Sequence, residues 1–213
     1  MARLRVSGLD WLAAQEAAGV LQLAFRDASN SCSYLLVEAV DHVALHRALD
    51  PDPLISYSEV RIEPVLRTGD MVRELTTYLG SGAPTLKDED WRALDSHGGR
   101  VDPAGSYFLA VKEVRPFSPL LPVAEQEQIH ANTLVSQRAH SDGREILDVN
   151  PVGRAVGILI MAAADEREVQ EHVHQCEVFV DTTVTYTRLL TITQARESNA
   201  AILVRMLPGC MRA

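Results

Sequence analysis

The sequence has few cysteines, no basic stripe and no long apolar run, and each of these absences excludes a class of protein. Its 213 residues include three cysteines and no CxxC pair, which disfavours a disulfide framework and indicates reduced thiols in the cytoplasm. The net charge of −9 disfavours a nucleic-acid partner. The longest apolar runs, such as VGILIMAAA, reach about half the length that a membrane span needs.

Three common catalytic motifs are also missing from the sequence. There is no glycine-rich phosphate loop, no serine nucleophile elbow and no HExxH. Dinucleotide chemistry and zinc-hydrolase chemistry are therefore disfavoured, and we expect neither a cofactor nor a metal. The composition, 46% apolar and 23% charged, is typical of a globular protein. We expect a small molecule as the partner, rather than nucleic acid or a membrane, and a homodimer is compatible with these features.

What the sequence does have is a weak internal repeat with an offset of 124 residues. Gly19 aligns with Gly143 and Asp41 with Asp165, and the register holds without a gap from 19–66 to 143–190. Few of the matched residues are identical, so the two copies are similar in the pattern of their residue types and not in their exact sequence.

The second copy predicts the order β-α-β-β-α-β, which is the split βαβ or ferredoxin-like unit. Asp165, with Glu168 three residues later, is a good N-cap for its second helix. The predicted elements are a strand over 107–114, a helix over 123–140, strands over 144–150 and 155–164, a helix over 166–176 and a strand over 178–193.

The first copy predicts the same order without its first strand. The predicted elements are a helix over 9–18, strands over 20–25 and 32–40, a helix over 42–50 capped by Asp41, and a strand over 58–66. The apolar segment 200–207 is a further predicted strand, and we hypothesise that it fills the vacant place.

These elements predict an α+β fold with four segments along the chain. Residues 1–66 form the first repeat, 67–106 a helical connector, 107–193 the second repeat, and 194–213 a C-terminal strand and tail. The exposed sheet face of a split βαβ unit needs a partner, so we expect the two repeats to pack into an intramolecular barrel of the dimeric α+β type.

Residues 33–66 carry a family resemblance. The strand ending at Glu38, the helix ALHRAL, the turn and strand PLISYSEVRIE, and Tyr34 resemble the second half of the muconolactone Δ-isomerase family. The resemblance implies a cofactor-independent reaction on a small molecule. That family carries Lys and Glu in the first helix of the unit for proton transfer. Here the first copy has Arg5 and Gly8 at those positions, and the second copy has Ile129 and Asn132.

Two residues of the second copy are the candidate catalytic residues. His130 could take or give a proton, with Asn132 orienting it. The alternative is a half-buried helical histidine with no role in catalysis.

The candidate substrate-binding residues are Arg154, Tyr107, Lys112 and Tyr186. Arg154 follows a turn and could hold an anion, or could be an exposed turn arginine. Lys112 and Glu113 point to opposite faces of one strand, so only one of them can face inward. Tyr186 belongs to an alternating strand that either lines a cavity or packs against another sheet.

Together these features predict a cofactor-independent isomerase or cyclase. Its substrate would be an unsaturated lactone, an acid or a polyketide-like intermediate. A non-catalytic ligand-binding or assembly protein of the same fold is the alternative, and a cofactor-independent monooxygenase is a second alternative.

The stretch EHVHQC, residues 171–176, looks like half of a metal site. On a helix, however, His172 and His174 lie about 200° apart and cannot ligate one metal together. Val169, Val173 and Cys176 form the expected buried stripe. We therefore predict a packing helix with two solvent-side histidines and no metal.

Overall fold

The computed structural model shows an α+β protein made of two compact units. The first unit comprises residues 1–62, 102–105 and 188–213, and the second comprises 63–101 and 106–187. The structure describes residues 2–80, 86–95, 99–114, 143–154, 156–175 and 182–210. None of the helices in these ranges is long and apolar enough to cross a membrane.

The first unit combines a β-hairpin with two long helices. Its described elements are α1 (Ala2–Ala17), β1 (Leu21–Asp27), β2 (Ser33–Val37), α2 (His42–Leu49), the 3₁₀ turn η1 (Ile55–Tyr57), the last residues of β7 (Thr182–Thr191) and α7 (Ile192–Cys210). The strands are hydrogen-bonded in the order β2-β1-β7, and both pairings are antiparallel.

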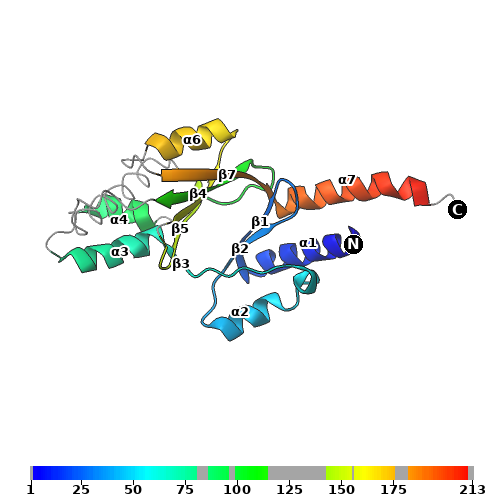
Figure 1. Ribbon diagram of the computed structural model, residues 1–213, viewed down its shortest axis with the longest axis horizontal. Coiled ribbons are helices and arrows are strands. Elements are labelled where there is room, and N and C mark those ends of the chain that lie inside the picture. The colour runs from blue at the N-terminus through cyan, green and yellow to red at the C-terminus, as the bar shows by residue number, and fades with distance from the viewer. Residues whose placement is uncertain are drawn as a thin grey trace. The chain divides into compact units, whose positions relative to one another are not determined.

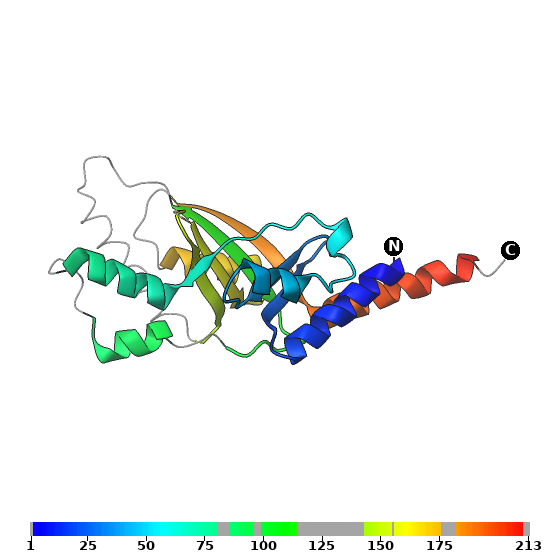
Figure 2. The same ribbon diagram turned by 90° about the horizontal axis from the view of Figure 1, so that it is seen from below.

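The core of the first unit lies where α1 and α7 pack side by side against β1, and both views show the two helices together (Figures 1 and 2). Its buried side chains are Leu9, Leu12, Leu21, Ala24, Ile192 and Ala195. Leu9 and Leu12 are three positions apart, so they share one face of α1. Gly19, with φ 72°, ends this helix in the left-handed conformation that glycine adopts readily.

The second unit is a sheet with helices. Its described elements are β3 (Val65–Arg67), α3 (Thr68–Leu79), α4 (Asp88–Asp95), β4 (Tyr107–Val114), β5 (Glu145–Pro151), β6 (Val156–Ala162), α6 (Glu166–Gln175) and residues 182–187 of β7. The strand order is β7-β4-β6-β5-β3. The pairings of β4 with β6, β5 with β6 and β3 with β5 are antiparallel.

The main core of the second unit lies between α6 and the sheet (Figure 1). Its buried side chains are Phe108, Ala110, Leu159, Met161, Ala163, Val169 and Val173. A smaller cluster joins α3 to α4 through Val72 and Leu94, and these helices lie side by side (Figure 2). The Arg73 guanidinium stacks over the Trp91 ring at 5.3 Å.

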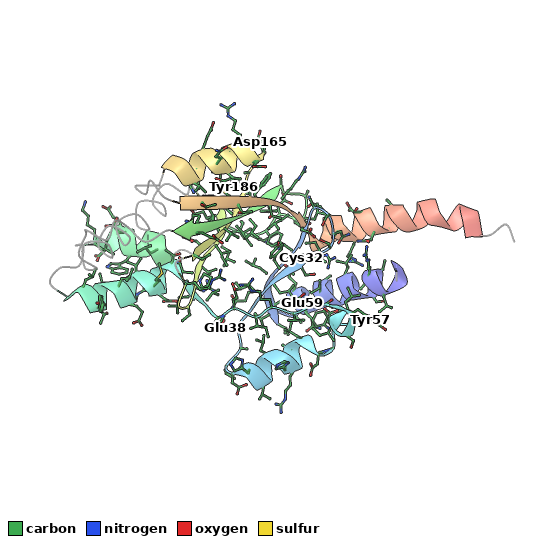
Figure 3. All side chains as sticks on the ribbon, in the orientation of Figure 1. Cys32, Glu38, Tyr57, Glu59, Asp165 and Tyr186 are labelled. Atoms are coloured by element: carbon green, nitrogen blue, oxygen red, sulfur yellow. The ribbon has the colours of Figure 1, made fainter. Side chains whose placement is uncertain are left out.

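Local signals in the sequence predicted several elements correctly. The strand over 107–114 is confirmed, and the helices α3 and α4 lie within 67–106, where a helical connector was predicted. Asp41 caps α2 by accepting a hydrogen bond from the Ala44 N–H at 2.7 Å. Asp165 caps α6 through the Glu168 N–H at 3.0 Å, and Figure 3 shows it at the start of that helix.

Two predicted strands are wrong. Residues 200–207 lie within α7 and are helical, so they do not supply the missing strand of the first repeat. The strand expected over 58–66 exists only at Val65–Arg67, where it pairs with β5. Pro64 cannot donate to a strand ladder, which explains why the strand does not extend through it.

Candidate functional site

One face of the sheet in the second unit carries several polar side chains that are buried. Lys112 on β4 lies opposite Gly157 on β6, and Asp148 on β5 lies opposite Leu159 on β6. Because residues two apart on a strand share a face, Lys112, Asp148 and Asn150 all lie on one face. Leu159 belongs to the core under α6, so this is also the face that α6 covers.

These side chains form what we call the lysine cluster: Lys112, Asp148, Asn150 and Thr68. All four are buried, with exposed fractions of 8%, 8%, 7% and 3%. Asn150 Nδ2 donates to Thr68 Oγ1 at 3.2 Å, and Thr68 Oγ1 donates to the Asp148 carbonyl oxygen at 3.2 Å. The first residue of α3 is thereby fixed to β5. Both carboxylate oxygens of Asp148 are shielded from solvent.

Gly157 leaves the space that the Lys112 side chain occupies. A Cβ at residue 157 would lie 2.9 Å from Lys112 Cε, and 3.6 Å from both Lys112 Nζ and Asn150 Oδ1. The first distance is too short for a real contact, so any side chain at residue 157 would displace the end of the lysine. The end of the Lys112 side chain therefore lies over Gly157 of β6.

Lysine is rare in this chain. Of its 20 basic residues, only Lys87 and Lys112 are lysines, and the others are arginines. Lys87 is exposed and lies 3.5 Å from Glu89 in a surface ion pair. Arginine is the usual choice for a buried ion pair, because its planar fork binds carboxylates at two points. A lysine in the interior of an arginine-rich chain instead supplies an amine that can act as a nucleophile or a base.

A second buried polar contact on the same face joins α6 to β5. His172 Nε2 lies 2.9 Å from Glu145 Oε1, and the two side chains are 2% and 0% exposed. Glu145 is paired with Met161, four residues along β6 from Gly157, so this contact lies roughly 13 Å from the lysine cluster along the strand. Within the part of the chain that the structure describes, no three His, Cys, Asp or Glu side chains come together as metal ligands.

The predicted solvent exposure of His172 is therefore wrong. Val169 and Val173 are buried as the helical stripe predicted. His172 lies beside Val173 on α6, and Glu145, 27 residues away in the sequence, supplies the polar contact that lets an imidazole enter the core. The side chain of His174 and all of Cys176 lie outside the described residues.

The structure brings only some of the predicted substrate-binding residues together. Lys112 faces inward and Glu113 is exposed. Tyr186 packs against the core that contains Ala110, two residues from Lys112 on the same face of β4. Tyr107 is buried but lies an odd number of residues from Lys112, so it points to the other face. His130 and Asn132 lie outside the described residues.

Arg154 lies in the turn between β5 and β6, four residues after Asn150. Its side chain is exposed, and Nη1 donates to Glu63 Oε1 at 2.5 Å. In this structure the partner of Arg154 is thus a carboxylate of the chain itself, and binding of a substrate anion there stays a prediction.

Sequence reasoning missed Asp148, Asn150 and Thr68 of the lysine cluster, and it missed Glu145 as the partner of His172. The strand ILDVN contained a signal, because Asp148 and Asn150 alternate and must share a face of an otherwise apolar strand. Thr68 had no such signal, since its neighbours come from β5, 80 residues away in the chain.

Comparisons with protein-family models, with curated proteins and with solved structures found no match. The chemistry of the lysine cluster is therefore the basis for a proposed function.

Proposed function

We propose that the chain is a cofactor-independent isomerase or cyclase that moves a proton on a small unsaturated lactone or acid. The observation that carries the proposal is a lysine and a carboxylate, Lys112 and Asp148, buried on one sheet face of the second unit. The three cysteines without a CxxC pair make the cytoplasm its proposed location.

The lysine cluster contains the two groups that the resembled family uses for proton transfer. The family carries them on a helix, and the corresponding positions here hold other residues. In the proposed reaction, the Asp148 carboxylate removes a proton next to the substrate carbonyl. The Lys112 ammonium stabilises the negative oxygen that develops, and Asn150 orients the substrate through its amide.

The strand arrangement of the second unit supports the split βαβ interpretation. In the order β7-β4-β6-β5, the first strand of the repeat lies between its third and last strands, and α6 connects β6 to β7. Gly19 and Gly143 share the left-handed conformation, with φ of 72° and 74°, which supports the proposed repeat register. The intramolecular barrel of two such repeats remains part of the proposal.

A non-catalytic binding protein is the second candidate, and one observation favours it. The hydrogen bonds from Asn150 to Thr68 and from Thr68 to Asp148 hold part of the cluster in a fixed network, as in an ordinary polar interior.

The experiment follows proton exchange on the substrate. The chain is incubated with muconolactone and simpler unsaturated lactones in D₂O, and deuterium uptake is measured by NMR. We expect exchange by the wild type, and in Lys112→Met and Asp148→Asn a loss of at least about a hundredfold. Lys87→Met is the matched control, because it removes the exposed lysine and should leave the rate unchanged.

The proposal is wrong if the wild type exchanges no lactone proton, or if both cluster variants keep the wild-type rate. Binding of a lactone without exchange, detected by shifts in the protein spectrum, would favour the binding protein. Near-UV circular dichroism of each variant shows whether the fold is intact.

A further inference from the structure

We propose that Lys112 is a carbonyl-reactive amine, which forms an iminium ion with an aldehyde or a keto acid. This inference rests on the proposed function in one respect, since it uses the same lysine cluster. It goes further by naming a covalent step and a substrate class, a small compound with a free carbonyl group.

The choice of residue is the first argument. The chain uses arginine at all but two of its basic positions, and one of the two lysines is in the interior. A guanidinium stays protonated and cannot attack a carbonyl, whereas a lysine amine is the usual partner in a protein Schiff base. Charge alone would be supplied by arginine, so the lysine indicates amine chemistry.

The geometry around the amine is the second argument. Gly157 provides the gap across which the side chain extends, and the amine and the Asn150 amide oxygen both lie 3.6 Å from the point where a Cβ would stand. Asn150 can accept a hydrogen bond from the nitrogen or from a substrate hydroxyl. Asp148, two residues away on the same face, supplies a carboxylate that can relay protons.

The proposed step balances without a further reactant. The Lys112 nitrogen forms a bond to the carbonyl carbon, and the carbon–oxygen bond breaks. The oxygen leaves as water with two protons from nitrogen, so an ammonium and a carbonyl give an iminium ion and one water. Asp148 carries a proton from nitrogen to oxygen and returns to its starting state.

The test traps the iminium ion by reduction. The full chain is incubated separately with glyoxylate, pyruvate and acetaldehyde in the presence of sodium cyanoborohydride, and the product is mapped by peptide mass spectrometry. We expect a reduced adduct on Lys112 and little on Lys87, which is the exposed internal reference. Lys112→Arg, which keeps the positive charge, should give no adduct at position 112.

Gly157→Ala provides a variant in which the lysine is kept and only its position changes. The added methyl group meets Lys112 Cε, so we expect trapping to slow by about tenfold or more. The inference is overturned if no probe is trapped on Lys112, if Lys87 reacts at least as fast, or if Gly157→Ala traps at the wild-type rate.

The two proposals fail separately. If lactone exchange depends on Lys112 but no carbonyl compound is trapped, the proposed function stands and the iminium step is wrong. If Lys112 is trapped but no lactone exchanges a proton, the iminium step stands and the isomerase is wrong.

Discussion

Among the residues that the structure describes, Arg26 in the first unit and Lys112 in the second are buried basic side chains on strands, and they differ in what surrounds them. Arg26 on β1 and Lys112 on β4 are both 8% exposed. Arg26 Nε donates to Asn30 Oδ1 at 2.8 Å and Nη1 donates to Ser33 Oγ at 2.6 Å, while Nη2 donates to the Asn30 carbonyl oxygen. Lys112 instead extends over Gly157 of β6, in the interior that it shares with Asn150 of β5.

This difference distinguishes Arg26, which has a structural role, from Lys112, which is a candidate reactive group. Every hydrogen-bond partner that we describe for Arg26 lies within seven residues of it, in the hairpin between β1 and β2. There the guanidinium holds Asn30 in the left-handed conformation, with φ 60°. The surroundings of Lys112 are assembled by the sheet from segments distant in sequence, as is usual for functional sites.

The largest expected effect is on the free energy of unfolding. It tests whether a buried polar contact of the second unit, between His172 and Glu145, stabilises the fold as the contacts of Arg26 do. In His172→Ala, the buried Glu145 carboxyl loses its imidazole contact, which should cost about 3–5 kcal/mol in the free energy of unfolding. Urea denaturation followed by circular dichroism measures the loss. His172→Gln, which can still donate to Glu145, is the matched control and should lose less. A cost below about 1 kcal/mol in His172→Ala would show that this contact is not structural.

The next effect concerns Arg26 itself. Arg26→Met removes the donors to Asn30 and Ser33 but keeps much of the apolar volume, so we expect a loss of about 2–3 kcal/mol. Arg26→Lys keeps the charge without the planar fork and should lose an intermediate amount. The measurement is urea denaturation followed by tryptophan fluorescence, to which Trp11 contributes from the core of the first unit. If Arg26→Lys equals the wild type, charge alone holds the hairpin and the contrast with Lys112 weakens.

Local features of the fold could be predicted from the sequence because their causes are local. Asp41 and Asp165 cap helices through contacts within four residues, and the alternation over 107–114 needs no distant partner. Residues 200–207 misled the prediction because an apolar run fits both a strand and a helix. The preceding segment ITQARESNAA is rich in helix-forming residues, and the helix that begins at Ile192 continues through it.

The candidate site could be predicted only in part. Strand alternation was enough to predict that one of Lys112 and Glu113 faces inward. It could not show that Gly157 would lie under the lysine, because the pairing of β4 with β6 depends on the sheet as a whole. The contact of His172 with Glu145 escaped prediction for the same reason. The spacing of three residues from Val169 places His172 beside the buried stripe of α6, but its partner on β5 lies 27 residues away in the sequence.

The smallest expected effect is the pH dependence of the hairpin that Arg26 supports. Partial burial on its own raises the pKa of Asp27, but hydrogen bonds from the Cys32 N–H, the Ser29 and Ser31 hydroxyls and the Ser31 N–H outweigh it and lower the pKa to about 2. The folded pKa is below the unfolded value of 3.8. The ionised carboxylate therefore contributes stability at higher pH, and this contribution is lost as the pH falls from the unfolded pKa through the folded one.

Comparison with Asp27→Asn isolates this contribution from the other carboxylates. The thermal midpoints of wild type and variant should differ at about pH 5 and converge towards about pH 2. Because Asp27 is largely solvated, screening keeps the difference below about 1 kcal/mol. A difference that stays constant over this range would mean that the effect of Asp27 on the turn does not depend on the ionisation of its carboxyl group. Arg26 alone would then account for the electrostatic part of the hairpin, which would sharpen its contrast with Lys112.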